Sequence, residues 1–261
     1  MGQMAEADLD RRFGGLKRLY GVKPAERLCA SHVVVVGIGG VGSWAAEALA
    51  RSGVQRITLI DMDHVAESNI NRQVHALECT LGQSKIEAMA ERIAQIHPTC
   101  DVRRVDDFVT ADNWHQLASD AGDVHAVIDA CDQVRAKQAM SAWAIRTSVP
   151  LVTVGAAGGK TRPQWVEVAD LADVTHDPLL ARLRYQLRRM GVVPKLAQRM
   201  GVSCVFSREP VAGPDPSCQM DSRDGSLNCH GYGSSVTVTA TFGMVAAACA
   251  MAHCVGAAKK M

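Results

Sequence analysis

A β-branched run that ends in closely spaced glycines limits the fold of this chain more than any other feature. The run is His32–Val36, and it is followed by Gly37, Gly39, Gly40 and Gly42. Apolar side chains at helical spacing come next. A strand, a tight glycine turn and a helix form a loop whose backbone can approach a phosphate, because the helix N-terminus presents free N–H groups. By itself, such a loop does not separate users of NAD, FAD, S-adenosylmethionine and ATP.

The first half of the chain alternates between strand and helix patterns. Strands are expected at 32–36, 56–60, 102–105, 126–128 and 151–154, and helices at 41–51, 83–96, 113–118 and 134–146. This order predicts an α/β fold, a Rossmann-like parallel sheet with helices on both faces. Further strands at 164–168 and 202–206 and a helix at 179–190 are expected to extend it. We expect one domain over residues 1–261, with a nucleotide-binding half (1–154) and a half for substrate and dimerisation (155–261).

The composition is that of a globular protein without a strong overall charge. Hydrophobic residues make up 48% of the 261 residues, and the formal net charge is +1, so any electrostatic attraction must come from local clusters. The first 31 residues are charged and lack the apolar core of a secretory signal. We therefore expect a cytoplasmic protein whose nine cysteines are reduced thiols, and no pair has the C-x-x-C spacing of a structural zinc site.

The last third contains a long loop and an apolar segment. Residues 209–233 are rich in Pro, Gly, Ser and Asp, which is typical of a loop. Residues Val236–Ala258 are long and apolar enough to span a membrane. However, three threonines interrupt the segment, and its first part alternates like a strand. A packed strand followed by a helix is favoured, and membrane association is the alternative.

Polar side chains gather after the second expected strand. Asp61 and Asp63 follow this strand directly, where a carboxylate can bind ribose hydroxyls. A dehydrogenase would share that acid. Asn69, Arg72 and Gln73 come next, and Lys85 begins the following helix; these amides and cations suit a triphosphate better than a pyrophosphate. The alternative for each cation is a solvated surface charge.

Two carboxylates follow the fourth expected strand. Asp129 and Asp132 lie where the carboxyl edge of a parallel sheet faces its ligand crevice. Asp132 could hold Mg²⁺, which prefers one or two carboxylates together with phosphate oxygens. Asp129 lies nearer the strand and could be structural, and either residue could cap the helix that begins near Gln133.

Taken together, these pieces resemble the ubiquitin-activating-type (HesA/MoeB/ThiF) adenylating enzymes. The matching segments are GIGGVG at 37–42, DMD at 61–63, NINRQ at 69–73, Lys85 and DACD at 129–132. Four further segments resemble the branch of this family that dehydrates threonylcarbamoyladenosine in tRNA: RFGGLKRLYG at 12–21, DDFVT at 106–110, CVFSREP at 204–210 and VTATFGMVA at 238–246. This resemblance covers almost the whole chain.

The resemblance implies a reaction and a set of site residues. The threonyl carboxylate would attack the α-phosphate of ATP, and the acyl-adenylate would then cyclise with release of AMP. Arg72, Lys85 and Asp132 would be catalytic, with Asp132 binding Mg²⁺. The nucleotide would be bound by Gly37, Gly39, Gly40, Gly42, Asp61, Asp63, Asn69, Arg72, Gln73, Lys85 and Asp129.

Two departures from the family pattern concern partners. A homodimer is expected, in which the family often supplies an arginine to the partner's ATP. That position is Gly15 here, so Arg12 or Arg18 would have to replace it. The paired C-x-x-C zinc motifs of the sulfur-carrier activators are absent, which argues against that branch.

A cationic segment between Pro178 and Arg208 suits a tRNA substrate. It contains no Asp or Glu, and its cations are Arg182, Arg184, Arg188, Arg189, Lys195, Arg199 and Arg208. Such a cluster is typical of phosphate contacts, and the alternative is a solvated helix face.

Three other functions are weighed against this one. The first is adenylation of a ubiquitin-like sulfur carrier, with Cys204, Cys218 or Cys229 as acceptor and a cysteine desulfurase or sulfur-acceptor protein as partner. The second is a non-catalytic nucleotide-binding scaffold. The third is an NAD oxidoreductase, in which the residues around Arg72 would have no role.

Overall fold

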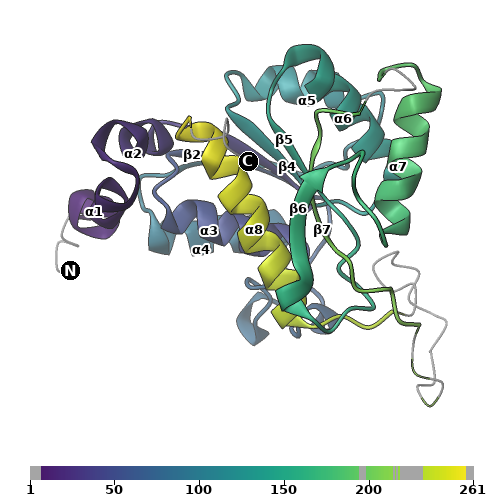
Figure 1. Ribbon diagram of the computed structural model, residues 1–261. Coiled ribbons are helices and arrows are strands. Elements are labelled where there is room, and N and C mark those ends of the chain that lie inside the picture. Colours follow the sequence, from purple (N-terminus) through teal and green to yellow (C-terminus); the bar gives the residue numbers. More distant parts are fainter. Residues whose placement is uncertain (1–6, 194–197, 214, 216, 218–231, 257–261) are drawn as a thin grey trace.

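Seven strands form one sheet in the computed structural model, which describes residues 7–193, 198–213, 215, 217 and 232–256 (Figure 1). The strand order is β3-β2-β1-β4-β5-β7-β6. The parallel strands are β1 (His32–Val36), β2 (Arg56–Ile60), β3 (Asp101–Val105), β4 (Ala126–Asp129), β5 (Leu151–Val154) and β7 (Ser203–Ser207). The edge strand β6 (Val166–Asp170) is antiparallel to β7. The predicted α/β class with a Rossmann-like sheet is confirmed.

Strand β1 lies in the interior of the sheet and is buried at every residue. Val33 pairs with Ile57 of β2 on one side and with Ala126 of β4 on the other. The chain therefore leaves β1 toward one edge of the sheet and later returns to its other side. In open parallel sheets a ligand crevice forms at the carboxyl ends of the strands where the order reverses in this way.

Helices cover both faces of the sheet, as the alternating sequence pattern predicts. The first face carries α2 (Val22–Cys29), α3 (Gly42–Arg51), α4 (Lys85–Ile96) and α8 (Val236–Cys254), and the second carries α5 (Trp114–Ala121), α6 (Val134–Thr147) and α7 (Pro178–Arg189) (Figure 1). Val33 and Val35 face the first layer, and Val34 and Val36 face the second. Each layer thus has its own apolar core. Helix α1 (Leu9–Tyr20) packs on α2 at the periphery.

The second half departs from the predicted element bounds in two places. The strand expected at 164–168 begins later, because Pro163 starts a short 3-10 turn, η3 (Pro163–Trp165). The strand expected at the start of Val236–Ala258 was wrong, because α8 is helical from Val236. The Thr241 hydroxyl donates to the Thr237 carbonyl at 2.7 Å, which satisfies an alternating threonine within a helix.

Helix α8 packs closely against α3. A Cβ added to Gly243 would lie 2.4 Å from the Val41 carbonyl oxygen and 2.8 Å from Cβ of Trp44, so the two helices approach at this glycine. In the part of the chain that the structure describes, α8 is the one helix long and apolar enough to cross a membrane, and half of its most apolar window is buried. This burial is that of a helix packed on the sheet.

Candidate active site

The glycine loop between β1 and α3 has a geometry that only glycine allows at two positions. Gly37 has φ +84°, and a Cβ added to Gly42 would lie 1.8 Å from the Gly37 carbonyl oxygen. A Cβ on Gly39, by contrast, would meet nothing within 4 Å. The loop is therefore tight on its inner side and open at Gly39, where its backbone is accessible to an anion.

Asp61 fastens this loop to the end of β2. Its Oδ2 accepts the Ile38 N–H at 2.5 Å, and its Oδ1 accepts the Asp63 N–H at 2.8 Å. The side chain is largely buried, and burial raises the pKa of Asp61 against the opposing influence of Lys85. The carboxylate predicted to bind ribose thus lies directly beside the glycine loop.

Lys85 joins the same group of side chains from the first residue of α4. Its Nζ lies 2.7 Å from Oδ2 of Asp63, and its side chain is 4% exposed. The Asp63 side chain is 48% exposed, so the carboxylate faces solvent while the ammonium is enclosed. An anion that enters the crevice would find a positive charge already fixed in place.

Arg72 reaches the loop from the segment after η1 (Glu67–Asn69). A Cβ on Gly40 would lie 3.3 Å from Cγ of Arg72, so the two residues are in contact. The Arg72 Nη1 donates to the Ser68 carbonyl at 2.5 Å and to Oδ1 of Asn71 at 2.9 Å. The structure therefore brings Arg72 to the loop that Asp61 and Lys85 flank.

Two further polar residues of the NINRQ segment, Asn69 and Gln73, are buried. Oδ1 of Asn69 accepts the Ala66 N–H at 3.1 Å, and the Asn69 carbonyl accepts the N–H groups of Arg72 and Gln73. Oε1 of Gln73 has no hydrogen-bond partner within the described residues. Asn69 thus shapes the turn that presents Arg72, and Gln73 retains an acceptor for a further group.

Two residues that were not predicted from the sequence also hold this arrangement together. Trp44 on α3 donates its Nε1–H to the Arg72 carbonyl at 2.9 Å. Cγ2 of Thr239, on α8, would lie 3.4 Å from a Cβ on Gly40. Neither contact has a sequence signal, because each depends on how α3 and α8 pack.

Asp129 is withdrawn from the crevice, which corrects its assignment to the nucleotide. Its carboxylate and the Lys137 ammonium are both 0% exposed, 3.1 Å apart. It also accepts the Thr153 hydroxyl at 2.5 Å. A carboxylate enclosed in this way has no face left for a ligand, so its role is structural. The counter-ion lies eight residues along the chain, which no local pattern reveals.

Asp132 is exposed just beyond β4. It does not cap α6, whose N-cap is Gln133 with no side-chain cap hydrogen bond. Within the described residues, no three His, Cys, Asp or Glu side chains are grouped to hold a metal ion. A single accessible carboxylate at this edge nevertheless fits Mg²⁺ that takes its other ligands from phosphate and water.

The proposed sulfur acceptors do not suit nucleophilic chemistry as far as the structure describes them. Cys204 lies within β7 at 0% exposure, and burial raises its pKa well above the ordinary range. Since the thiolate is the reactive form, such a cysteine is inert. Cys218 and Cys229 lie outside the described residues. Of the three candidates, the described Cys204 is therefore not a suitable sulfur acceptor.

The cationic segment is divided by its contacts. Arg184 donates to the Leu171 and Val174 carbonyls, and Arg208 pairs with Glu167 at 2.8 Å. Lys195 lies outside the described residues, and Arg188 is partly buried. Among the described residues of this segment, the exposed cations without an ion pair are Arg182, Arg189 and Arg199.

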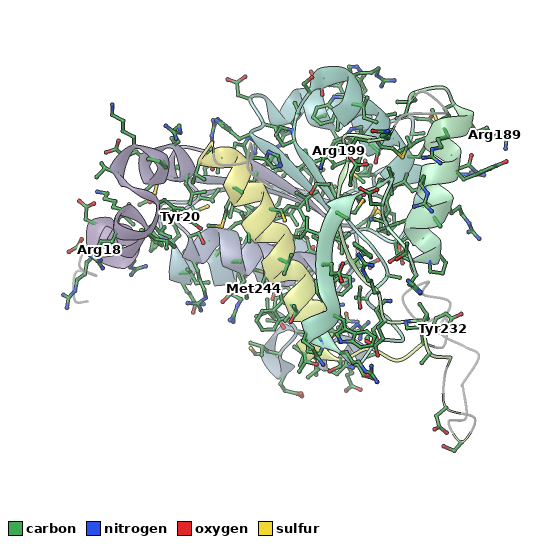
Figure 2. The ribbon with its side chains drawn as sticks, in the orientation of Figure 1. Arg18, Tyr20, Arg189, Arg199, Tyr232 and Met244 are labelled. Carbon is green, nitrogen blue, oxygen red and sulfur yellow. The ribbon has the colours of Figure 1, made fainter. Side chains whose placement is uncertain are left out.

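The two candidates for a trans-acting arginine lie on α1. Arg12 Nη1 donates to the Ile96 carbonyl of its own chain at 2.7 Å. Arg18 is exposed, and Figure 2 shows it beyond α2, on the side of the molecule away from α7. Neither side chain reaches the glycine loop of its own chain.

A buried histidine near Lys85 is uncharged at neutral pH. His75 is 1% exposed, and neither ring nitrogen has a partner within the described residues. Burial, with the nearby charges of Lys85 and Arg92, lowers the pKa of His75 to about 4. The ordinary value of 6.5 applies once the chain unfolds.

The free energy of unfolding is therefore expected to fall as the pH drops from 6.5 toward 4. In this range His75 binds a proton in the unfolded chain but not in the folded one. Relative to His75→Asn, the wild type should lose about 2 kcal/mol between pH 7 and pH 5. Urea unfolding of both proteins at the two pH values measures this difference. The other histidines are common to both. Identical pH dependence in the two proteins would contradict the assignment.

Comparison with known proteins settles the family. The model of the ThiF family matches residues 11–260. The chain belongs to the ThiF family. It is 50% identical over 244 residues to the Escherichia coli tRNA threonylcarbamoyladenosine dehydratase, with 90% of each chain covered. The Haemophilus influenzae protein of the same name is 41% identical over 248 residues, with 93% of each covered. The E. coli dehydratase solved in complex with ATP has a TM-score of 0.85 at 47% identity, over 98% of this chain and 99% of that one.

Proposed function

We propose that this chain catalyses the ATP-dependent cyclisation of threonylcarbamoyladenosine in tRNA, with loss of one water. The observation that carries the proposal is the meeting of the glycine loop, Asp61, Lys85 and Arg72 at one edge of the sheet. The chain that contains them belongs to the ThiF family and is 50% identical to a tRNA threonylcarbamoyladenosine dehydratase. The relatives' ATP complex makes ATP the expected nucleotide.

Nucleotide binding follows from the arrangement of the loop. The open backbone at Gly39 and the N-terminus of α3 would hold phosphate, and Asp61 would accept ribose hydroxyls. Arg72 contacts the loop at Gly40, Lys85 lies beside Asp63 after β2, and both would contact the triphosphate. Phosphate oxygens would compete with Asp63 for the Lys85 ammonium. Asn69 and Gln73 would hold in place the turn that carries Arg72.

The chemistry then has two steps. The threonyl carboxylate attacks the α-phosphorus, a new P–O bond forms, and the bond to the bridging oxygen breaks, so that pyrophosphate leaves. The carbamoyl group next attacks the activated carbonyl and expels AMP. This ring closure needs no protein nucleophile, because an intramolecular attack has a high effective molarity. Arg72 and Lys85 would stabilise the charge that develops on the phosphate oxygens.

Asp132 is the carboxylate that would hold Mg²⁺. The ion would offset the negative charge of the phosphates when it is bound. Asp129 has no part in this role, because Lys137 neutralises it within the core.

Substrate and assembly complete the proposal. The exposed Arg182, Arg189 and Arg199 would bind the tRNA backbone, and a tRNA substrate would agree with the cytoplasmic location that we propose. We also propose a homodimer, in which exposed Arg18 is the free candidate for the partner's nucleotide. A cysteine desulfurase or sulfur-acceptor protein is not required.

Incubation of the protein with ATP, Mg²⁺ and tRNA that carries the modified adenosine is expected to convert the nucleoside to a form lighter by one water. AMP and pyrophosphate should appear in equal amounts. Nucleoside mass analysis measures the conversion, with Asp132→Asn as the variant expected to fail. An unchanged nucleoside with folded, ATP-binding protein would reject the proposal.

A further inference from the structure

A hollow of about 420 Å³ lies on the second helical face, outside the site described above. It opens between α5 and α6 and is bounded by Met190, the residue that follows α7. A hollow of this size exceeds what a single water or ion needs.

The hollow exists because α6 carries small side chains between two arginines. Arg135, Ala139, Ala142 and Arg146 all line it and recur at positions i, i+4, i+7 and i+11. This spacing places them on one face of the helix, with the two arginine Cα atoms roughly 16 Å apart. The alanines leave space that a larger residue would fill.

The floor is aromatic. Trp114 and Trp143 pack edge to face with ring centroids 5.4 Å apart at an angle of 87°. Trp114 is 2% exposed, and its Nε1–H has no acceptor within the described residues. The Nε1–H is enclosed within the protein, so the rings, and not this donor, form the base of the hollow.

The charge of the lining is cationic. Arg135 and Arg146 are exposed and form no ion pair in the part of the chain that the structure describes. His115 lines the hollow as well, and no Asp or Glu does. A cation at each end of a hollow with an aromatic base suits one nucleotide of a single strand. Its two flanking phosphates would meet the two cations, and its base would lie between them.

We infer that this hollow receives one unpaired nucleotide of the tRNA, close to the nucleotide that is modified. The inference rests on the proposed function and assigns part of its substrate surface. Arg135 follows Asp132 by three residues, so α6 leads from the proposed site of adenylation into the hollow. Met190 adjoins exposed Arg189, which connects the hollow to the cationic side of α7. Trp143 is 9% exposed, so the base would pack on the alanines and on the accessible part of this ring, with the arginines beside its flanking phosphates.

Two variants separate the phosphate contacts from the base pocket. The double variant Arg135→Gln/Arg146→Gln should raise the KM for tRNA roughly tenfold and lower its salt dependence by one to two in log–log slope. Ala139→Leu fills the hollow and should raise that KM roughly tenfold with the salt slope unchanged. The matched control Arg11→Gln/Lys23→Gln removes the same charge from the region of α1 and α2 and should leave KM near that of the wild type.

The KM for ATP decides between this inference and others. It should stay unchanged in all three variants, because the hollow lies outside the glycine loop. A rise in the KM for ATP would assign the hollow to ATP and overturn the inference. So would a KM for tRNA that equals the control in both variants while the wild type converts tRNA normally. A wild type that converts no tRNA would instead reject the proposed function.

Discussion

Replacing Lys85 with methionine is expected to lower kcat/KM for cyclisation by about 10²–10³-fold. Methionine fills similar space but carries no charge to stabilise the phosphate oxygens. The effect is large because the Lys85 side chain is 4% exposed and Asp63 fixes its Nζ at 2.7 Å. Electrostatic interactions are stronger in such a site than in water. The loss should fall on kcat more than on the KM for ATP, since Asp61 and the glycine loop still bind the nucleotide.

Lys17→Met is the matched control for this variant. The Lys17 Nζ also lies 2.7 Å from a carboxylate, that of Asp10, but its side chain is 43% exposed on α1. Its removal should leave the rate within about twofold, as exposed ion pairs contribute little. Timed nucleoside mass analysis measures both proteins. A Lys85 variant that keeps the wild-type rate would remove Lys85 from the mechanism.

Local sequence patterns predicted most of the first half of this fold. The bounds of β1, β2 and β5 agree with the expected ranges, because β-branched runs between glycines and helical patterns have few other ways to fold. The glycine loop was equally predictable from the sequence, since the positive φ at Gly37 and the close contact at Gly42 both require glycine. The convergence of Asp61, Arg72 and Lys85 was predictable because carboxyl ends of parallel strands share an edge.

The errors share a different cause, which is tertiary context. Asp129 resembled a nucleotide-binding residue in the sequence, but in the structure it is buried in an ion pair with Lys137. Helix α8 resembled a strand at its start because its threonines alternate with apolar residues. In the helix, the Thr241 hydroxyl instead donates to the Thr237 carbonyl. In the cationic segment, Arg184 donates to backbone carbonyls and Arg208 forms an ion pair, so neither is free to bind phosphate. Apart from the threonine, whose acceptor is four residues away in the same helix, these partners lie too far along the sequence to leave a local pattern.

The buried pair of Lys137 and Asp129 gives the largest expected effect on stability. Lys137→Met should lower the free energy of unfolding by about 3–5 kcal/mol, because it leaves a carboxylate in the core without its counter-ion. Lys137→Met combined with Asp129→Leu should recover much of this loss, since neither charge then remains buried. Urea unfolding of the two variants and the wild type measures the difference. Equal stability of single and double variants would contradict the pairing.

The magnesium dependence of cyclisation provides an independent check on this pair. This pair closes the end of β4 only three residues before Asp132. Loss of the lysine should consequently loosen the edge where Mg²⁺ is proposed to bind, and the Mg²⁺ concentration needed for half-maximal cyclisation should rise in the single variant more than in the double one.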